Sequence, residues 1–303
     1  MGSKIREKVI NDICVVTCHF NFADYMRPKA NLRRFQRQME KDGVPVFGIE
    51  VYLKHQTPIT TGWNGWTQFQ IPRHAILWQK EALMNACVER VPEAFTKIAC
   101  VDADVWFERP DWLQATSKAL DKFKVVQPFS VAVWGDEDGK EIQKSNSCAA
   151  LRQNEYLDGH PGFAVAARRE LWTEQLGLFH LGVCGHGDTI SMCGFLGLKM
   201  KEFQLAGVGG TLDADINTQE WARVTAIYTR KKVGLVEGTV FHEWHGSRKN
   251  RRYCERNDDL KHFNPLEHIE THEDGYLLWS RNTPARMMVS VEQYFIGRKE
   301  DGE

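Results

Sequence analysis

The clearest chemical signal in this sequence is a pair of aspartates, Asp102 and Asp104, directly after the apolar run Lys97–Val101. The run has the length and composition of a strand buried on both faces. Residues i and i+2 of an extended chain point the same way, so both carboxylates would leave the strand end on one face. Two hard oxygen ligands at the carboxyl edge of an α/β sheet suit Mg²⁺ or Mn²⁺ carrying a phosphate group. A solvated turn is the alternative, but the second apolar run Val105–Phe107 disfavours it.

A glycine-rich stretch, Gly182–Gly197, supplies a third acid. Gly185 and Gly187 permit tight turns, and Asp188 follows them where a helix should begin. Asp188 is therefore either an N-cap that accepts hydrogen bonds from the first backbone N–H groups or an acid with a chemical role.

The predicted strand Val233–Glu243 ends in the segment Phe241–Gly246, which reads FHEWHG and contains two histidines. His242 is compatible with a place in the core, whereas His245 has room beside it because Gly246 follows.

The elements that would bring these groups together alternate along the chain. Strands are predicted at Ile13–Thr17, Val44–Leu53, Lys97–Val101, Val125–Phe129, Phe163–Ala167 and Val233–Glu243. Helices are predicted around Leu32–Met39, over Arg73–Ala94, from Pro110 to Phe123, after Asp188 and over Asn217–Lys232. The β-α-β start favours a parallel sheet. The predicted fold class is α/β, with a mostly parallel central sheet flanked by helices in one domain (1–246), and a helical C-terminal extension (247–303) packed on it.

Two segments show no clear period. Lys54–Pro72 is predicted to be a long surface loop, and long ordered loops are often functional. Its tryptophans, Trp63 and Trp66, are either platforms for sugars or bases or anchors of the loop itself. Lys140–Asp158 is polar and is expected to be mobile.

Composition limits the class of protein. The chain has 303 residues, with 39 Lys plus Arg and 40 Asp plus Glu, for a formal net charge of −1. Such a balance disfavours a protein that mainly coats nucleic acid. No run approaches the ~20 apolar residues of a membrane span, and the N-terminal residues lack a secretory signal pattern. The eight cysteines include no Cys-X-X-Cys pair. We expect a cytoplasmic enzyme with reduced thiols.

Taken in order, these signals resemble the nucleotide-sugar glycosyltransferases of the GT-A fold, particularly family-2-like and galactosyltransferase-type members. The resemblance spans about Ile13–Tyr253. Its specific parts are Asp102-Ala103-Asp104, His160-Pro161-Gly162-Phe163 with Ala166-Ala167-Arg168-Arg169, Gly185-His186-Gly187-Asp188, and Trp244-His245-Gly246.

The resemblance implies a role for each motif. Asp104, assisted by Asp102, would hold a divalent ion on the donor diphosphate, and His245 would be a further ligand that favours Mn²⁺ over Mg²⁺. Asp188 matches the acid that takes the proton from the acceptor hydroxyl in inverting members. The commonest galactosyltransferase pattern has two consecutive acids here, whereas Thr189 follows Asp188 in this chain. The residues expected to contact the nucleotide are Thr17, Glu50, Lys80, Asp102 and Arg248.

The implied donor is a nucleotide-sugar, with a UDP-sugar expected. The expected acceptor is a hydroxymethylated pyrimidine in DNA, as in phage-type DNA-modifying enzymes, and a glycan or a small molecule is the alternative. Two basic groups would favour DNA, and they are Arg27, Lys29, Arg33, Arg34 and Arg37, and the run Arg248–Arg256. A nucleotidyltransferase is the competing class, but the loop after Thr17 lacks the glycine-rich phosphate loop. A non-catalytic glycan-binding relative is the third alternative.

Overall fold

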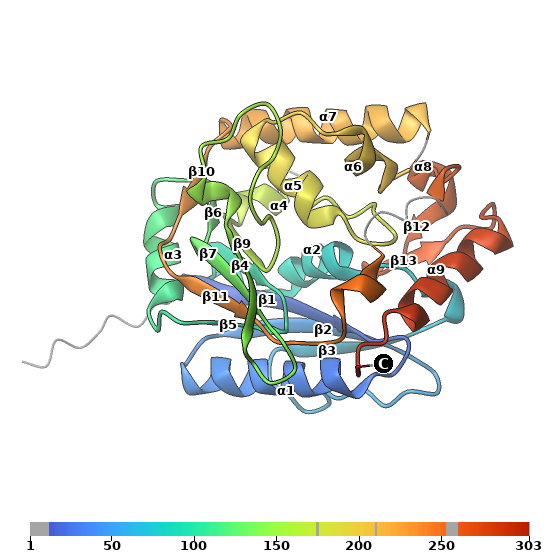
Figure 1. Ribbon diagram of the computed structural model, residues 1–303, viewed down its shortest axis with the longest axis horizontal. Coiled ribbons are helices and arrows are strands. Elements are labelled where there is room, and N and C mark those ends of the chain that lie inside the picture. The colour runs from blue at the N-terminus through green and yellow to red at the C-terminus, as the bar shows by residue number, and fades with distance from the viewer. Residues whose placement is uncertain (1–11, 174–175, 210, 253–259, 303) are drawn as a thin grey trace, which may run out of the picture.

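The central element of the computed structural model is a seven-stranded sheet with helices on both faces (Figure 1). The structure describes residues 12–173, 176–209, 211–252 and 260–302. The strand order is β10-β6-β9-β4-β1-β2-β3. The strands are β1 (Ile13–Phe20), β2 (Val46–Leu53), β3 (Trp66–Ile71), β4 (Lys97–Val101), β6 (Val125–Gln127), β9 (Ala164–Arg168) and β10 (Val233–Leu235). Only β9 runs antiparallel to its neighbours, β4 and β6, so the predicted mostly parallel sheet is confirmed.

The two innermost strands are buried on both faces, as their apolar sequences predict. Alternate residues of β1 point to opposite faces: Cys14 and Val16 pack in one cluster, Ile13 and Val15 in another. Helix α2 (Lys80–Arg90) covers the first face. Helices α1 (Met26–Lys41) and α3 (Trp112–Leu120) cover the second. The α1 side chains that pack there recur at helical spacing, and they are Leu32, Phe35 and Met39.

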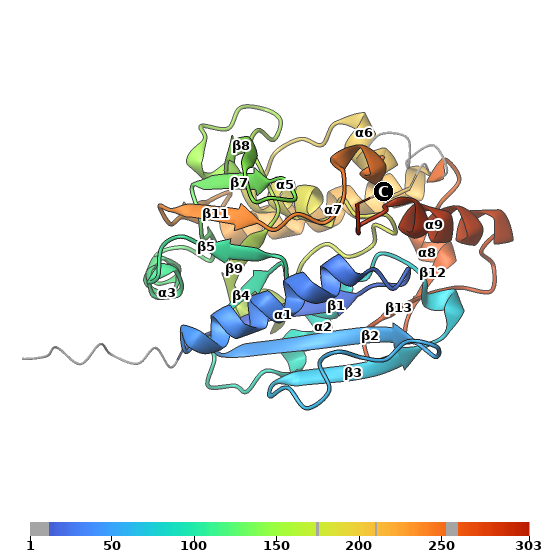
Figure 2. The ribbon, with the colours of Figure 1, turned by 60° about the horizontal axis from the view of Figure 1, so that its bottom comes forward.

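A smaller sheet continues from the end of β4 (Figure 2). Its order is β5-β11-β7-β8, with bounds β5 (Val105–Phe107), β11 (Thr239–His242), β7 (Val131–Gly135) and β8 (Glu141–Asn146). The prediction of one strand over Val233–Glu243 is wrong, because Gly238, at φ +147°, divides it into β10 and β11 in different sheets. The polar segment Lys140–Asp158 was expected to lack order, yet it contains β8 and a 3₁₀ turn (Cys148–Ala150).

The predicted loop Lys54–Pro72 is only partly a loop, because its last residues form β3 beside β2. Trp66 is buried in β3, and its indole N–H donates to Gln36 Oε1 at 3.0 Å. Trp63 packs edge-to-face against Trp66, with 5.8 Å between ring centroids. Both tryptophans therefore anchor the segment. The predicted helix Arg73–Ala94 is likewise divided, into a 3₁₀ turn (Arg73–Ala75) and α2.

The rest of the chain completes the α/β architecture. The remaining elements are α4 (Glu170–Thr173), α5 (Gly187–Leu196), α6 (Glu202–Ala206), α7 (Leu212–Thr229), a 3₁₀ turn (Arg248–Arg251), α8 (Pro265–His268), β12 (Ile269–Thr271), β13 (Leu277–Trp279) and α9 (Ala285–Gly297). The described part of the basic run Arg248–Arg256 is this 3₁₀ turn and its C-cap Arg252, and residues 253–256 lie outside the described residues. Within the described ranges no helix has the length and apolar composition to cross a membrane.

The C-terminal residues return to the start of α1. Asp301 accepts hydrogen bonds from the backbone N–H groups of Met26 (2.9 Å) and Arg27 (2.6 Å). These are N–H groups of the first turn, which have no partner inside the helix, and an anion there also complements the helix dipole. Tyr25 Oη accepts from the Lys299 N–H at 3.0 Å. The last described residues are thus held beside the carboxyl end of β1.

Candidate active site

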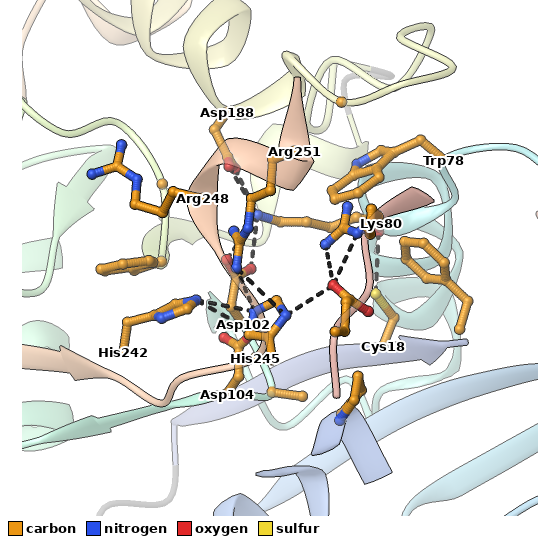
Figure 3. Close-up of a pocket in the computed structure, with 18 of the residues that line it drawn as sticks. Cys18, Trp78, Lys80, Asp102, Asp104, Asp188, His242, His245, Arg248 and Arg251 are labelled. Carbon is orange, nitrogen blue, oxygen red and sulfur yellow. Dashed lines mark hydrogen bonds and ion pairs between the residues drawn. The ribbon is translucent and has the colours of Figure 1, made fainter. Parts of the chain in front are cut away.

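A cavity of about 570 Å³ opens at the carboxyl ends of β1 and β4, between the two sheets and the C-terminal segment (Figure 3). Its lining includes most of the groups that the sequence singled out, namely Lys80, Asp102, Asp104, Asp188, His245 and Arg248. It also includes His242, Arg251, Arg298 and Glu300. These side chains divide into two clusters, one around Asp104 and one around Lys80.

The first cluster brings together three metal-ligating side chains. The ligand atoms of Asp104, His242 and His245 all lie within 4.8 Å of one another. Asp104 Oδ2 is 3.0 Å from His245 Nε2 and 3.7 Å from His242 Nε2. The two Nε2 atoms are 3.2 Å apart. The ligand atoms of one carboxylate and two imidazoles therefore converge on one small region of the cavity.

Strand pairing explains this convergence. In the β5–β11 register Val105 is the partner of His242, and the Glu243 N–H donates to the Asp104 carbonyl at 2.8 Å. Asp104, which directly precedes β5, is thereby placed beside His242 at the end of β11 and beside His245 just after it. The sequence favoured His245 and left His242 in the core. His242 is buried, but the pairing aims its ring at Asp104, and the i, i+3 spacing of the two histidines was the available signal.

The residues present fit a divalent cation. Asp104 Oδ1 is buried and has no hydrogen-bond partner among the described residues, so a carboxylate lone pair is left for a ligand. Burial holds the pKa of His242 well below its usual range, which keeps the imidazole neutral as a metal ligand must be. Two imidazoles with one carboxylate suit Mn²⁺ or another transition ion better than Mg²⁺.

Glu300, in the C-terminal segment, contacts His245 and so helps to orient one of the three ligand side chains. Its Oε1 lies 2.8 Å from His245 Nδ1, so an N–H at Nδ1 donates to this carboxylate and leaves the lone pair on Nε2, the nitrogen beside Asp104. Arg298 donates to the same oxygen from Nε at 2.9 Å. Burial alone would raise the pKa of Glu300, but Arg298 and His245 hold it well below its usual range. Gly246 permits this approach, since a Cβ there would lie 2.6 Å from the Lys299 carbonyl oxygen.

We expect Glu300→Gln to weaken Mn²⁺ binding by about 10- to 100-fold while the chain stays folded, because the amide cannot polarise the imidazole as a carboxylate does. Titration of Mn²⁺ into the purified variant measures this. Glu270→Gln changes an exposed glutamate of the same C-terminal segment and should leave the affinity unchanged. Equal affinities in all three proteins would exclude the supporting role of Glu300.

In the second cluster Lys80 bridges two carboxylates. Lys80 is the first residue of α2, and its Nζ lies 2.7 Å from Asp102 Oδ1 and 2.9 Å from both oxygens of Asp188. Burial alone would lower the pKa of Lys80, but Asp102 and Asp188 outweigh it and raise the pKa well above its usual range. Asp102, expected to assist as a metal ligand, is thus engaged by Lys80 and does not belong to the group of three ligands.

Asp188 is not the N-cap of its helix. That position belongs to His186, at φ +78°, and Asp188 is the second residue of α5. Its side chain turns into the cavity and is about one third exposed. Among the described residues Lys80 donates to both oxygens of this carboxylate, and the side chain lines the cavity. The structure therefore gives this acid a position suited to chemistry on a bound molecule.

Glu81 is a buried acid behind this cluster that the sequence did not single out. Its Oε2 accepts the indole N–H of Trp78 at 3.0 Å. The start of α5 packs against it so closely that a Cβ on Gly187 would lie 2.3 Å from the Glu81 carboxyl carbon. Burial and the nearby Asp188 raise the pKa of Glu81 from 4.5 to about 8, although Lys80 opposes this.

This raised pKa predicts a pH-dependent stability difference. Between pH 4.5 and about 8 the folded state keeps a proton on Glu81 that the unfolded state has lost, so the free energy of unfolding falls as pH rises through that range. Glu81→Gln removes the effect and keeps an acceptor for Trp78. We expect the variant to gain on the order of 1 kcal/mol relative to the parent between pH 5 and pH 8. Thermal denaturation across this range is the measurement. Glu89→Gln, exposed on the same helix, is the control, and parallel curves for parent and Glu81→Gln would contradict the prediction.

Two predicted nucleotide contacts lie outside the cavity lining. Glu50 is buried inside β2, where its carboxylate accepts the Thr60 hydroxyl (2.7 Å) and the Ile59 N–H (3.0 Å). It therefore holds the following loop in place. Thr17 is fully buried inside β1, and its hydroxyl has no partner among the described residues. Thr17 lies outside the cavity lining because it is buried in the sheet, and Glu50 lies outside it because its side chain holds the loop.

The beginning of the basic run does enter the cavity. The Arg248 guanidinium lies over the Trp134 ring, 5.3 Å from its centroid. An Arg251 guanidinium nitrogen is 2.9 Å from His245 Nε2. Arg248, Arg251 and Lys80 thus place three cations on the wall of the cavity. Arginine pairs well with phosphate oxygens.

Comparison with known proteins gives distant structural likenesses only. No protein-family model matches the sequence, and no curated protein matches it. Among solved structures, the catalytic domain of Drosophila β1,4-galactosyltransferase 7 in complex with xylobiose has a TM-score of 0.39 at 10% identity, covering 93% of this chain and 99% of that chain. A mutant of that enzyme, in complex with manganese, UDP-Gal and xylobiose, gives the same values.

A synthase with a different name gives a similar likeness. The 4-diphosphocytidyl-2C-methyl-D-erythritol synthase of Anaerococcus prevotii has a TM-score of 0.35 at 12% identity, covering 75% of this chain and 87% of that chain. Likenesses this distant assign neither a family nor a substrate to this chain.

Proposed function

We propose that this chain is a metal-dependent glycosyltransferase that moves a sugar from a nucleotide-sugar, expected to be a UDP-sugar, to an acceptor hydroxyl. The observation that carries the proposal is the group Asp104, His242 and His245 on the wall of a cavity that also holds a separate carboxylate, Asp188. Metal ligands, phosphate-binding cations and a proton acceptor are the three parts that such a transfer needs. The motif resemblance found in the sequence supports the same assignment.

Each part has a role in the proposed reaction. Asp104, His242 and His245 hold a divalent ion, Mn²⁺ by preference, which when bound neutralises charge on the diphosphate leaving group. Arg248 and Arg251 bind diphosphate oxygens in the same cavity. A side chain of the second cluster, Asp188, accepts the proton of the attacking hydroxyl, and Lys80 keeps its carboxylate in place.

The C-terminal extension belongs to the same catalytic unit in this proposal. The described residues before 247 supply the sheet edge and the metal ligands, and those after it, including Arg248, Arg251, Arg298 and Glu300, complete the lining of the cavity. Glu300 orients His245, and Arg298 secures Glu300. A domain boundary at 246/247 would therefore separate the metal ligands from the group that orients one of them.

For the acceptor, a glycan hydroxyl is favoured over a hydroxymethylated base in DNA. Much of the basic group on α1 is engaged in ion pairs, namely Arg27 with Glu137, Lys29 with Asp24, and Arg34 with Glu243. Paired cations release few counterions when they meet phosphates. Trp63 and Trp66 anchor their own segment and are not placed to fill the gap left by a flipped base.

The donor is tested by thermal denaturation with a panel of nucleotide-sugars, with and without Mn²⁺. Ligands that bind the folded state raise its stability in proportion to affinity, so the correct donor should raise Tm only when Mn²⁺ is present.

Labelled donor is then offered to glycans and to hydroxymethylcytosine-containing DNA at two salt concentrations. We expect label in a glycan, at a rate insensitive to salt. Label in DNA at a rate that falls steeply with salt would reverse the acceptor assignment. Formation of a nucleotide-sugar from a sugar phosphate and a nucleoside triphosphate, without transfer, would overturn the proposal.

A further inference from the structure

Helix α7 lies along one edge of the molecule (Figure 1) and exposes an apolar strip. Its inner face is buried, with side chains such as Ala222 and Ala226 at or below 9% exposure. On its outer face Ile216 is 56% exposed and Ile227 is 65% exposed. The two isoleucines are eleven residues apart, which is about three helical turns, so they lie on the same line along the helix.

The charges on this face are divided by position along the helix. The N-terminal half carries Asp213 and Glu220, and the C-terminal half carries Arg223, followed by Arg230 at the C-cap. All four are exposed. Glu220 and Arg223 form a bidentate ion pair near the middle, at 2.7 and 2.8 Å. If a second α7 lies antiparallel to the first, each of these acids therefore faces a base of the other helix.

We propose that the outer face of α7 binds the same face of a second copy of this chain, with the two helices antiparallel. A two-fold axis between Trp221 and Ala222 places Ile216 against the partner's Ile227, and the reverse. The same axis places Glu220 against the partner's Arg223 and Asp213 against the partner's Arg230. An interface of this kind is self-complementary, as two-fold symmetry requires.

The helix dipole alone would also favour acids early and bases late in α7. It gives no reason for two isoleucines at the centre of the exposed face, because a monomer gains nothing from leaving them in water. The axis that pairs Ile216 with Ile227 is also the one that pairs all four charges. Parallel packing would instead bring Glu220 against Glu220 and Arg223 against Arg223.

The size of the face predicts the strength of the contact. An 18-residue helix is about 27 Å long, so one helix pair buries less than the roughly 1,200–2,000 Å² of a stable interface. We therefore expect a dimer with a dissociation constant on the order of micromolar or weaker, in equilibrium with monomer.

Sedimentation equilibrium of the full chain over a range of concentrations tests the proposal. The parent should show a reversible dimer, and Ile216→Lys should shift it to monomer. Ile142 is equally exposed, at 56%, on β8, so Ile142→Lys is the matched control and should dimerise like the parent. A parent that stays monomeric at every concentration, or a dimer unaffected by Ile216→Lys, would overturn the proposal.

Two further variants test the register. Asp213→Arg should weaken the dimer by placing like charges together, and adding Arg230→Asp should restore it; Asp tolerates the left-handed backbone at 230 better than most residues. Under mild oxidation, a mixture of Ile216→Cys and Ile227→Cys chains should form a disulfide-linked dimer, whereas either variant alone should not, since like positions lie about 17 Å apart along the helix. Cross-linking of Ile216→Cys with itself would show parallel packing and would overturn the antiparallel arrangement.

Discussion

Asp188→Asn should lower turnover by about 100-fold or more while donor affinity is retained. Asparagine has nearly the same shape as aspartate and keeps an oxygen that can accept a hydrogen bond from Lys80, which lies 2.9 Å from the carboxylate. What it loses is the ability to accept a proton from the acceptor hydroxyl. The effect should therefore appear in kcat and not in the binding of the nucleotide-sugar. Steady-state kinetics and donor titration on one variant give both quantities.

A purely structural role for Asp188 predicts a different result. Loss of the ion pair with Lys80 would then lower Tm and leave kcat per folded molecule near that of the parent. Asp215→Asn is the matched control, because Asp215 is also an acid in the first turn of a helix but lies outside the cavity lining. Normal turnover in folded Asp188→Asn would remove this residue from the catalytic assignment.

Substitution of the metal ligands should abolish both transfer and metal-dependent donor binding. Asp104→Asn, His242→Ala and His245→Ala each remove one of the three donor atoms that converge in the cavity. His242 and His245 are buried and Asp104 is partly buried, so the three donor atoms are held in place, and we expect loss of one of them to lower activity by more than about 100-fold. The increase in Tm that donor and Mn²⁺ give together should be lost as well.

Asp102→Asn tests whether the Lys80 cluster is distinct from the group of three metal ligands. Asp102 is held by Lys80 and lies outside the group of three ligands, so this variant should still bind the ion even if transfer slows. His262→Ala, at an exposed histidine, should behave like the parent in every assay. If Asp102→Asn lost the ion while His242→Ala kept it, the ligand assignment would be wrong.

The parts of the fold that the sequence predicted are those fixed by local pattern. The apolar run before Asp102 is β4, and the helical period from Leu32 to Met39 is the buried face of α1, because burial on a regular element requires a regular spacing. β3 was missed because half of Trp66–Ile71 is polar and the strand packs at the sheet edge. The reversal of β9 depends on its place between β4 and β6, which no local pattern records.

Residues of the candidate site were likewise predicted where a local pattern marked them and missed where only the fold brings them together. Asp104 and His245 were recognised because each ends a strand or adjoins a glycine. His242 was left in the core, since its value as a ligand depends on the β5–β11 register. Glu300 was missed because it reaches His245 across 55 residues of sequence, through the contact of the C-terminal segment with Gly246. Such long-range contacts arise only when the fold is complete.

Calorimetric titration of Mn²⁺ in the presence of UDP tests the central claim most directly. The parent should bind one ion per chain, and Asp102→Asn should bind one as well. His242→Ala and Asp104→Asn should bind none over the same range, although both should denature cooperatively like the parent. Binding of Mn²⁺ to His242→Ala with the stoichiometry and affinity of the parent would contradict the claim that Asp104, His242 and His245 form the metal centre.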